Sequence, residues 1–196
     1  VREKDALKAG LEETAERVLR EMSLPLVVKA PTQGSTIGTT FVHERKDVVR
    51  ALETAYRYDR VALVEQFIGG IEVTAPVLGN DDPVTLPLIE IVSATGVYDY
   101  EAKYTPGMSD HIIPPRIPGE QQAMIKELAV RTFKALGCRG LARVDFMVEP
   151  GGGVYILEVN TIPGMTATSL FPDSARAAGI DFPQLVDQIV KLALEK

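Results

Sequence analysis

Two carboxylates and an amide fall on one face of a predicted β-hairpin. Asp145 lies in one apolar, strand-like segment, and Glu158 and Asn160 lie in the next, across a Pro-Gly-Gly-Gly turn at 150–153. Because side chains alternate along a strand, this turn places Asp145 opposite Glu158 and its neighbour Arg143 opposite Asn160. Opposed carboxylates repel unless a cation lies between them, and such oxygen ligands suit Mg²⁺. The pattern predicts a metal site; the alternative is an ordinary acidic surface.

A loop of small residues follows an apolar strand that ends in a lysine. Lys29 ends the strand, and Gly34, Ser35, Thr36 and Gly38 supply backbone N–H groups and hydroxyls that can surround phosphate oxygens. The loop lacks the Walker A order, in which the lysine follows the glycines. A charge at the end of an apolar strand needs a partner, and phosphate would serve. The alternative is a plain turn with a lysine that extends to solvent.

Three more charged residues are weaker candidates for a functional site. Glu65 ends a predicted strand, and Glu72 follows it across a Gly-Gly pair that could act as a hinge beside a crevice. Lys103 lies in a long loop, where its alternative is a solvated surface lysine. Three further polar or reactive residues look structural or incidental: His43, His111 and Cys138.

Hydrophobic periodicity predicts an alternation of helices and antiparallel strands. Predicted helices cover residues 5–22, a segment capped at Asp47, 120–136, 169–178 and 182–194. Predicted strands cover residues 26–28, 40–42, 61–65, 71–77, 87–92, 141–148 and 154–159. An irregular stretch runs from Tyr98 to Pro118, and loops of that length in compact domains are usually functional or disordered. The pattern indicates an α+β fold.

Composition excludes several classes of protein. The 196 residues carry 21 Lys and Arg against 27 Asp and Glu, a net charge of −6, which argues against nonspecific nucleic-acid binding. One cysteine and two histidines exclude an intrachain disulfide and a cysteine- or histidine-rich metal centre. No apolar run is long enough to cross a membrane, and no signal peptide is evident, so we expect a cytoplasmic protein. Because the chain begins at Val1, we expect a piece of a longer protein.

These residues together resemble a known family. Lys29 with Gln33–Gly38, and then Val64–Ile68 with Glu72, resemble the nucleotide-binding half of the ATP-grasp fold. The remaining blocks are similar to D-alanine–D-alanine ligases: Tyr98–Tyr104, Arg143–Asp145, Leu157–Thr161 and Pro163–Thr166. The resemblance runs from about residue 10 to the end of the chain. It implies two α+β subdomains, 1–70 for nucleotide binding and 71–196 for catalysis, that enclose the nucleotide site.

The resemblance also implies a role for each matching residue. ATP would be held by Lys29, Ser35, Thr36, Glu65, Gln66, Phe67, Ile68, Glu72 and Lys103. Two Mg²⁺ ions, with Mn²⁺ as a substitute, would be bound by Asp145, Glu158 and Asn160. The oxyanion would be stabilised by Arg143 and the backbone of Gly164. The second D-alanine would lie at Ser169 and Leu170. A lid from Tyr98 to His111 would bring Tyr104 to Ser35, and the family has Tyr there for D-alanine as acceptor and Phe for D-lactate.

The implied activity is ATP-dependent ligation of two D-alanine molecules through an acyl phosphate, for peptidoglycan synthesis, cell-wall biogenesis and cell shape. The alternatives are D-alanine–D-lactate ligation, another ATP-grasp carboxylate–amine ligation, or a nucleotide-binding fragment that is inactive alone. The expected partners are D-alanine, an N-terminal domain that binds the first D-alanine, and a second copy in a full-length homodimer. Nucleic acid and membrane are not expected. Gln33 departs from the family, which usually has Glu there.

Overall fold

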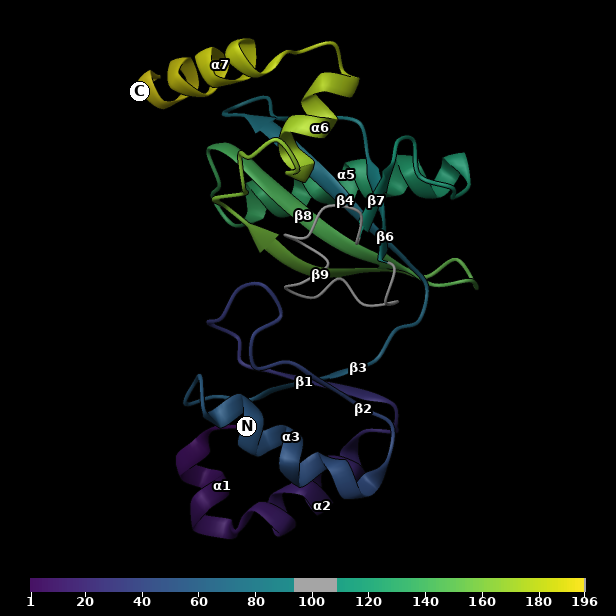
Figure 1. Cartoon of the computed structure of the whole chain (residues 1–196), viewed down its shortest axis with the longest axis vertical. Helices are drawn as coiled ribbons and strands as arrows, with labels where there is room; N and C mark the ends of the chain where they lie inside the picture. Colours follow the sequence, from purple (N-terminus) through teal and green to yellow (C-terminus); the bar gives the residue numbers. More distant parts are fainter. Residues whose placement is uncertain (94–108, 196) are drawn as a thin grey trace. The chain divides into compact units, whose positions relative to one another are not determined.

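The computed structural model describes residues 1–93 and 109–195, which form two compact units (Figure 1). The first unit runs from Val1 to Ile68, and the second begins at Gly69. This boundary lies two residues before the expected one. Gly70 is required at the start of the second unit because a Cβ atom there would lie 2.0 Å from the carbonyl oxygen of Val148.

The first unit is a three-stranded antiparallel sheet covered by helices. Its elements are α1 (Glu3–Ala9), α2 (Leu11–Glu21), β1 (Leu26–Lys29), β2 (Thr40–Val42), η1 (Arg45–Asp47), α3 (Val48–Tyr56) and β3 (Leu63–Gln66). The strand order is β2-β1-β3. Alternate residues of β1, Leu26 and Val28, are fully buried against Val18 of α2 and Leu52 of α3. Val27 and Lys29 therefore lie on the opposite, more open face.

Two predictions for this unit differ in detail from the structure. The expected single helix over 5–22 is divided into α1 and α2 at Gly10, whose φ of +95° interrupts the helical backbone. Asp47 is the N-cap residue of α3, as predicted, but it belongs to the short 3-10 turn η1 and its side chain makes no capping bond.

The second unit is a six-stranded antiparallel sheet with helices on both faces. Its strands are β4 (Ile71–Gly79), β5 (Val84–Thr85), β6 (Ile89–Ser93), β7 (Ser109–Ile112), β8 (Gly140–Val148) and β9 (Val154–Asn160). Its described helices are α5 (Gly119–Ala135), α6 (Leu170–Ala177) and α7 (Phe182–Leu194). The strand order is β7-β6-β4-β8-β9, with β5 paired to β4. Residues Ser109–Ile112 were expected within the irregular stretch, but they pair with β6.

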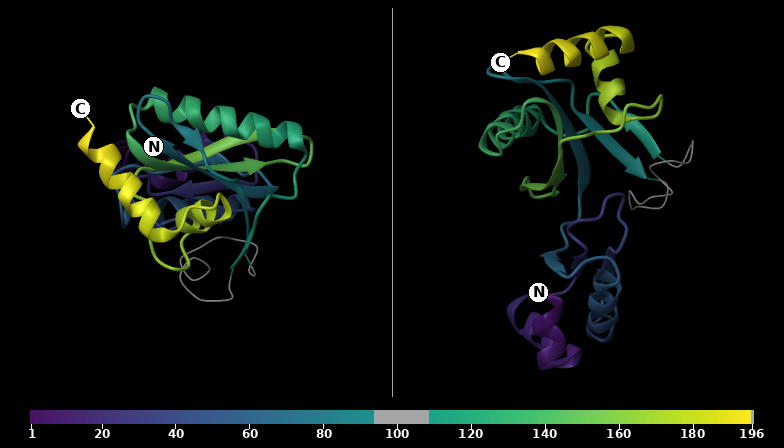
Figure 2. Two further views of the ribbon diagram at one scale, coloured as in Figure 1. Left: turned by 90° about the horizontal axis from the view of Figure 1, so that it is seen from above. Right: turned by 90° about the vertical axis from the view of Figure 1, so that its left-hand side faces the viewer.

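Helix α5 covers one face of this sheet, and α6 and α7 cover part of the other (Figure 2). Under α5 the sheet is apolar, with Val73 of β4 and Val144 and Phe146 of β8 packed against Phe133. On the opposite face, Leu78 and Leu141 pack against residues of α6 and α7. The middle of that face is polar. The helices therefore leave a polar strip on an otherwise packed sheet.

None of the helices described, over residues 1–93 and 109–195, is long and apolar enough to span a bilayer.

Candidate functional site

The polar strip is centred on a buried carboxylate. Asp145 is 5% exposed, and strand pairing places it beside Thr74 of β4, whose hydroxyl donates to Oδ1 at 2.6 Å. Arg143, two residues earlier on the same face, donates from Nε to Oδ1 at 2.9 Å and from Nη2 to Oδ2 at 2.8 Å. A buried ion pair is stable when its hydrogen bonds are satisfied in this way.

At this site the strand pairs of the hairpin are the predicted ones, although the register nearer the turn differs from the predicted register. Asp145 pairs with Glu158, and Arg143 pairs with Asn160. Nearer the turn, however, Val148 rather than Glu149 pairs with Val154. A β-bulge beside Asp145 absorbs the extra residue. The turn is one residue longer than predicted, and the bulge shifts the register back by one residue. The site residues therefore keep their predicted partners.

Arg143 already neutralises the charge of Asp145, so the pairing of Asp145 with Glu158 does not by itself require a metal. The oxygen donors nevertheless fit one. Glu158 is exposed and forms no ion pair within residues 1–93 and 109–195, and Asn160 accepts one hydrogen bond, from the backbone of Ile162 at 3.1 Å. Each of these oxygens has lone pairs left. Among the described residues no three His, Cys, Asp or Glu side chains gather as a metal cluster, so the candidate set is two carboxylates and an amide.

Gly164, one of the two expected oxyanion residues, lies close to the expected acceptor residues Ser169 and Leu170, in the loop before α6 and at its start. Ser169 Oγ accepts from the backbone N–H of Thr166 at 3.0 Å and lies 2.8 Å from its hydroxyl. A Cβ atom on Gly164 would lie 2.8 Å from the same Oγ, so only glycine fits there without displacing Ser169. Leu170 is 2% exposed and packs with Ile89 and Ile91. Its side chain belongs to the core, which leaves the backbone at the start of α6 as its means of contacting a ligand.

Glu72 is placed on the same face of the sheet. It lies two residues before Thr74 on β4 and pairs with Ile91 on one side and Met147 on the other. Its side chain is half-buried and has an interaction partner.

In the first unit, the lysine expected to need a phosphate has a protein partner. The register of β1 and β3 places Val27 opposite Glu65, so Lys29 and Glu65 lie on the same open face. Lys29 Nζ lies 2.6 Å from a Glu65 carboxylate oxygen. The partner that the charge of Lys29 requires is therefore, within the protein, a second residue predicted to bind the nucleotide.

The glycine-rich loop has an unusual backbone. Ser35 and Thr36 have φ values of +53° and +63°, and the N–H of Ile37 donates to the carbonyl of Gly34 at 3.1 Å. Two successive left-handed residues define a tight turn that normally takes Gly or Asn. For a β-branched residue this conformation costs about 1–3 kcal/mol and is concentrated at functional sites. The strain favours a binding loop over a plain turn.

The base of this loop is tied to the segment between α3 and β3. Asp59 accepts from the backbone and the hydroxyl of Thr32 at 3.1 and 2.6 Å, and from the N–H of Val61. Gln33 donates its amide to the carbonyl of Tyr58 at 3.3 Å, a bond that a glutamate at this position could not make.

We predict that the anchor at Asp59 weakens in acid. The Thr32 hydroxyl holds the pKa of Asp59 below its ordinary value of 3.8. Because the folded pKa of Asp59 is lower than the unfolded one, the anchor stabilises the fold fully above the unfolded pKa, and this stabilisation is lost as the pH falls from 3.8 through the lower folded pKa. Melting temperature measured from pH 6 to pH 3 should therefore fall less steeply for Asp59→Asn than for the unaltered protein. Parallel curves would contradict this role.

Phe67, which follows β3 and which the family resemblance assigns to the nucleotide, lies in an aromatic cluster that the sequence analysis did not predict. Phe67 lies edge-on to Phe41, with ring centroids 5.9 Å apart, and 6.0 Å from the ring of His43. Gln66 is exposed and donates to the carbonyl of Pro25 at 2.8 Å, and Ile68 is half-buried. Pairing of β1 with both neighbours brings these rings together, and a single strand's periodicity does not reveal that.

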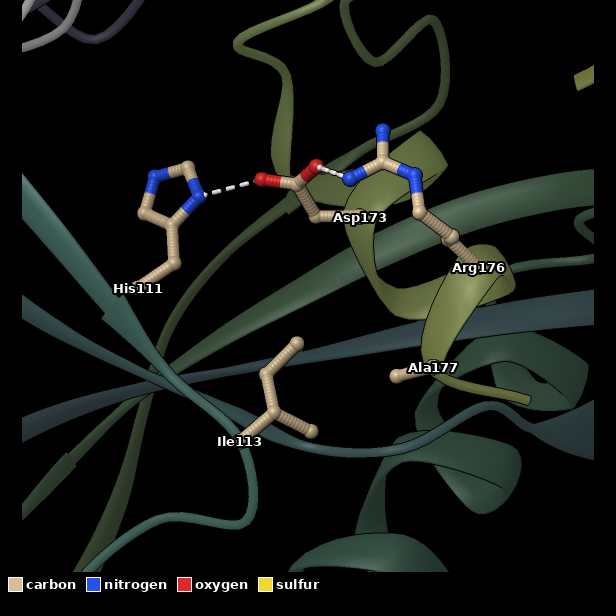
Figure 3. Close-up of a pocket in the computed structure, with 5 residues that line it drawn as sticks. All are labelled: His111, Ile113, Asp173, Arg176 and Ala177. Atoms are coloured by element: carbon tan, nitrogen blue, oxygen red, sulfur yellow. Dashed lines mark hydrogen bonds and ion pairs between the residues drawn. The ribbon is translucent and has the colours of Figure 1, made fainter. Parts of the chain in front are cut away.

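The expected lid lies mostly outside the described residues. This applies to Lys103 and Tyr104, while Ser109–Ile112 at its far end forms strand β7. His111 on this strand lies 2.6 Å from Asp173 of α6, beside a pocket of about 340 Å³ (Figure 3). No local pattern in the sequence predicts this contact, because the two residues are 62 positions apart.

Comparison with known proteins agrees with these features. The family described as "D-ala D-ala ligase C-terminus" matches residues 1–191. A D-alanine–D-alanine ligase of Pelotomaculum thermopropionicum is 72% identical over 195 residues, which are all of this chain and 61% of that protein. The chain thus spans about three-fifths of that relative's length.

Two solved structures are also similar. The VanG D-Ala:D-Ser ligase from Enterococcus faecalis superposes with a TM-score of 0.82 at 34% identity, covering 98% of this chain and 55% of that one. A D-alanine–D-alanine ligase from Bacillus anthracis complexed with ATP gives 0.70 at 32% identity, covering 90% of this chain and 53% of that one.

The two antiparallel α+β units, with a strained small-residue loop in one and a polar hairpin face in the other, define an ATP-grasp protein. Within that class the similarity is specific. The chain belongs to the D-alanine–D-alanine ligase family.

Proposed function

We propose that this chain is the nucleotide-binding and catalytic part of an ATP-dependent ligase that joins two D-alanine molecules. The observation that carries the proposal is the 72% identity, across the whole chain, to a protein named D-alanine–D-alanine ligase. The product, D-alanyl-D-alanine, would serve peptidoglycan synthesis in the cytoplasm. The first D-alanine would be bound largely by an N-terminal domain outside residues 1–196, and the complete protein would be a homodimer.

ATP would be bound by the residues that the family resemblance assigns to it. In the first unit, Lys29 would contact phosphate while Glu65 keeps its ammonium group in place, a role supported by their 2.6 Å ion pair. The strained backbone at Ser35 and Thr36 would present N–H groups to the phosphates. The segment Glu65–Ile68 would hold the base, and Glu72 the ribose. Lys103 would contribute a further positive charge. A relative crystallised with ATP supports the nucleotide assignment.

Magnesium would be bound by Asp145, Glu158 and Asn160. When bound, Mg²⁺ or Mn²⁺ would offset the negative charge that accumulates where phosphate oxygens meet a carboxylate. The support is the oxygen-only donor set, with one carboxylate buried and fixed by Arg143 and Thr74. Because Asp145 is held at both oxygens, it would approach the metal without rearrangement.

The proposed reaction has two steps. The carboxylate of the first D-alanine attacks the γ-phosphorus of ATP, which releases ADP and leaves an acyl phosphate. The amine of the second D-alanine then attacks the acyl carbon, the C–N bond forms, and inorganic phosphate leaves as the amine loses a proton. Arg143 and the N–H of Gly164 would stabilise the oxyanion of the tetrahedral intermediate. Ser169 and the backbone of Leu170 would hold the acceptor's carboxylate, and the lid would exclude water.

Acceptor choice separates this proposal from its alternatives, since one similar structure is a D-Ala:D-Ser ligase. With D-alanine, D-serine and D-lactate supplied together, the full-length protein should form mainly D-alanyl-D-alanine. Tyr104 lies outside the described residues. If its hydroxyl binds Ser35, Tyr104→Phe should raise the share of D-lactate product at neutral pH about tenfold, as loss of one hydrogen bond does.

Product ratios measured by mass spectrometry test both statements. Tyr155→Phe is the matched control, because its hydroxyl binds Glu149 at the hairpin turn. Predominant D-serine or D-lactate product from the unaltered protein would overturn the proposed function. An unchanged ratio in Tyr104→Phe would instead overturn only the role of that tyrosine.

A further inference from the structure

The contact between His111 and Asp173 joins two elements that the chain separates widely. His111 lies on β7 and Asp173 in the first turn of α6. His111 Nδ1 and Asp173 Oδ2 are 2.6 Å apart, and both side chains are more than four-fifths buried. Arg176 donates to the other carboxylate oxygen at 2.9 Å from an exposed position. Figure 3 shows the side chains of His111 and Arg176 directed at the same carboxylate.

Asp173 is bonded directly to the start of α6. Its backbone N–H donates to the carbonyl of Ser169 at 3.2 Å, and the Ser169 hydroxyl is in turn bonded to Thr166. A displacement of Asp173 would therefore move Ser169 and Leu170, the residues proposed to receive the acceptor.

Phe171 and Ala175 pack α6 against Leu78 of β4, and two further contacts of the helix lead towards β6. Leu170 packs against Ile89 and Ile91 of that strand. The buried Ser174 donates its hydroxyl to the carbonyl of Pro87, just before the strand, at 2.6 Å. These contacts fix one side of the helix. Among the described residues, α6 and β7 are joined by one polar contact, which is the bond between Asp173 and His111.

Strand β7 has little else to hold it. It has four residues and lies at the edge of the sheet, paired with β6 alone. The pocket of about 340 Å³ beside His111, lined also by Ile113, Arg176 and Ala177, leaves that side without close packing. Ile113, directly after the strand, packs against the cluster that contains Leu170, and the bond between His111 and Asp173 adds a direct polar tie between β7 and α6. The strand begins at Ser109, immediately after the segment that contains Lys103 and Tyr104.

We propose that His111 and Asp173 are positioning residues for the acceptor site. By tying β7 to the first turn of α6, they hold the backbone at Ser169 and Leu170 where it can bind the carboxylate of the acceptor substrate. They do not touch substrate themselves. This inference rests on the proposed function, and it adds two residues to the machinery that selects and orients the second D-alanine.

The test compares two substitutions of His111 in the full-length protein. His111→Leu removes the donor, while His111→Asn keeps an N–H that can reach Asp173. His111→Leu should raise the KM for the acceptor D-alanine about tenfold or more, as a misplaced substrate does, with the KM for ATP changed less than about twofold. In His111→Asn, the KM for the acceptor should return most of the way to the value of the unaltered protein. Arg176→Gln, which cuts the exposed bond to the same carboxylate, is the control and should leave both KM values unchanged.

Hydrogen exchange gives a readout that does not depend on turnover. In His111→Leu, amides of residues 168–174 should exchange faster than in the unaltered protein, and in His111→Asn they should be protected again. Equal rises in both KM values, or an Asn variant as impaired as the Leu variant, would overturn the positioning role. So would unchanged exchange in His111→Leu. An unaltered protein that forms no dipeptide would refute the proposed function instead, and exchange would then decide whether the pair fixes α6.

Discussion

Glu158→Gln should reduce dipeptide synthesis by the full-length protein by roughly 10²–10³-fold, the usual cost of removing one charge-stabilising group from an active site. The substitution keeps the size of the side chain and removes its charge. Because Glu158 is exposed and forms no ion pair in the described parts of the chain, the fold should not depend on it. The loss would come from weaker binding of the metal that offsets the phosphate charge. Initial rates over a range of Mg²⁺ concentrations give the measurement, and half-saturation should shift to higher Mg²⁺.

Glu149→Gln is the matched control for this experiment. It makes the same chemical change on the same hairpin, but Glu149 lies at the turn and accepts from the hydroxyl of Tyr155. Activity and Mg²⁺ dependence should be close to those of the unaltered protein. If Glu158→Gln kept the original Mg²⁺ dependence, the hairpin face would not be the metal site.

The hairpin could be predicted from the sequence because its information is local. Alternation and a glycine-rich turn are enough to pair Asp145 with Glu158. The bulge was not predictable, since it depends on how the turn closes, with the N–H of Glu149 bonded to the carbonyl of Gly153. The predicted pairing survived because the bulge restored the register before the site residues.

Contacts between distant strands could not be predicted in the same way. Thr74 and Asp145 are 71 residues apart, and their bond follows from the register of β4 on β8, which a single sequence does not specify. The pairing of Lys29 with Glu65 likewise depends on the register of β1 on β3. The sequence identifies each charged residue but not its protein partner, which is why phosphate was the partner expected for Lys29.

Short or interrupted elements account for the remaining differences. Strand β7 has the sequence Ser-Asp-His-Ile, which shows no apolar alternation, and it forms because β6 offers an open edge. The sequence does not reveal the break at Gly10, because apolar residues keep the spacing of one helix on both sides of it. In each case a neighbouring element or a single backbone angle outweighed the periodic pattern.

Residues 1–196 on their own should make no measurable D-alanyl-D-alanine. They contain the residues proposed for phosphate, metal and oxyanion contacts, but the family resemblance assigns the first D-alanine to an N-terminal domain outside them. Orientation of two reactants contributes about 7–11 kcal/mol to an effectively unimolecular reaction. Without a site for one substrate, most of that contribution is lost, while weak ATP binding by the isolated chain should persist. Mass spectrometry of the product and a nucleotide-binding titration measure the two properties separately.

The isolated chain should also self-associate, because α7 exposes four apolar residues at intervals of four, on one side of the helix: Phe182, Val186, Val190 and Leu194. An apolar stripe of this kind is typical of a covered surface. Adding the N-terminal segment of a close relative, such as the 72% identical ligase, should restore dipeptide synthesis and reduce association, measured by sedimentation. Substituting Val186 and Val190 by Gln should reduce association without restoring synthesis, which separates solubility from substrate positioning. Sustained dipeptide production by residues 1–196 with no other chain present would show that both substrate sites lie within them.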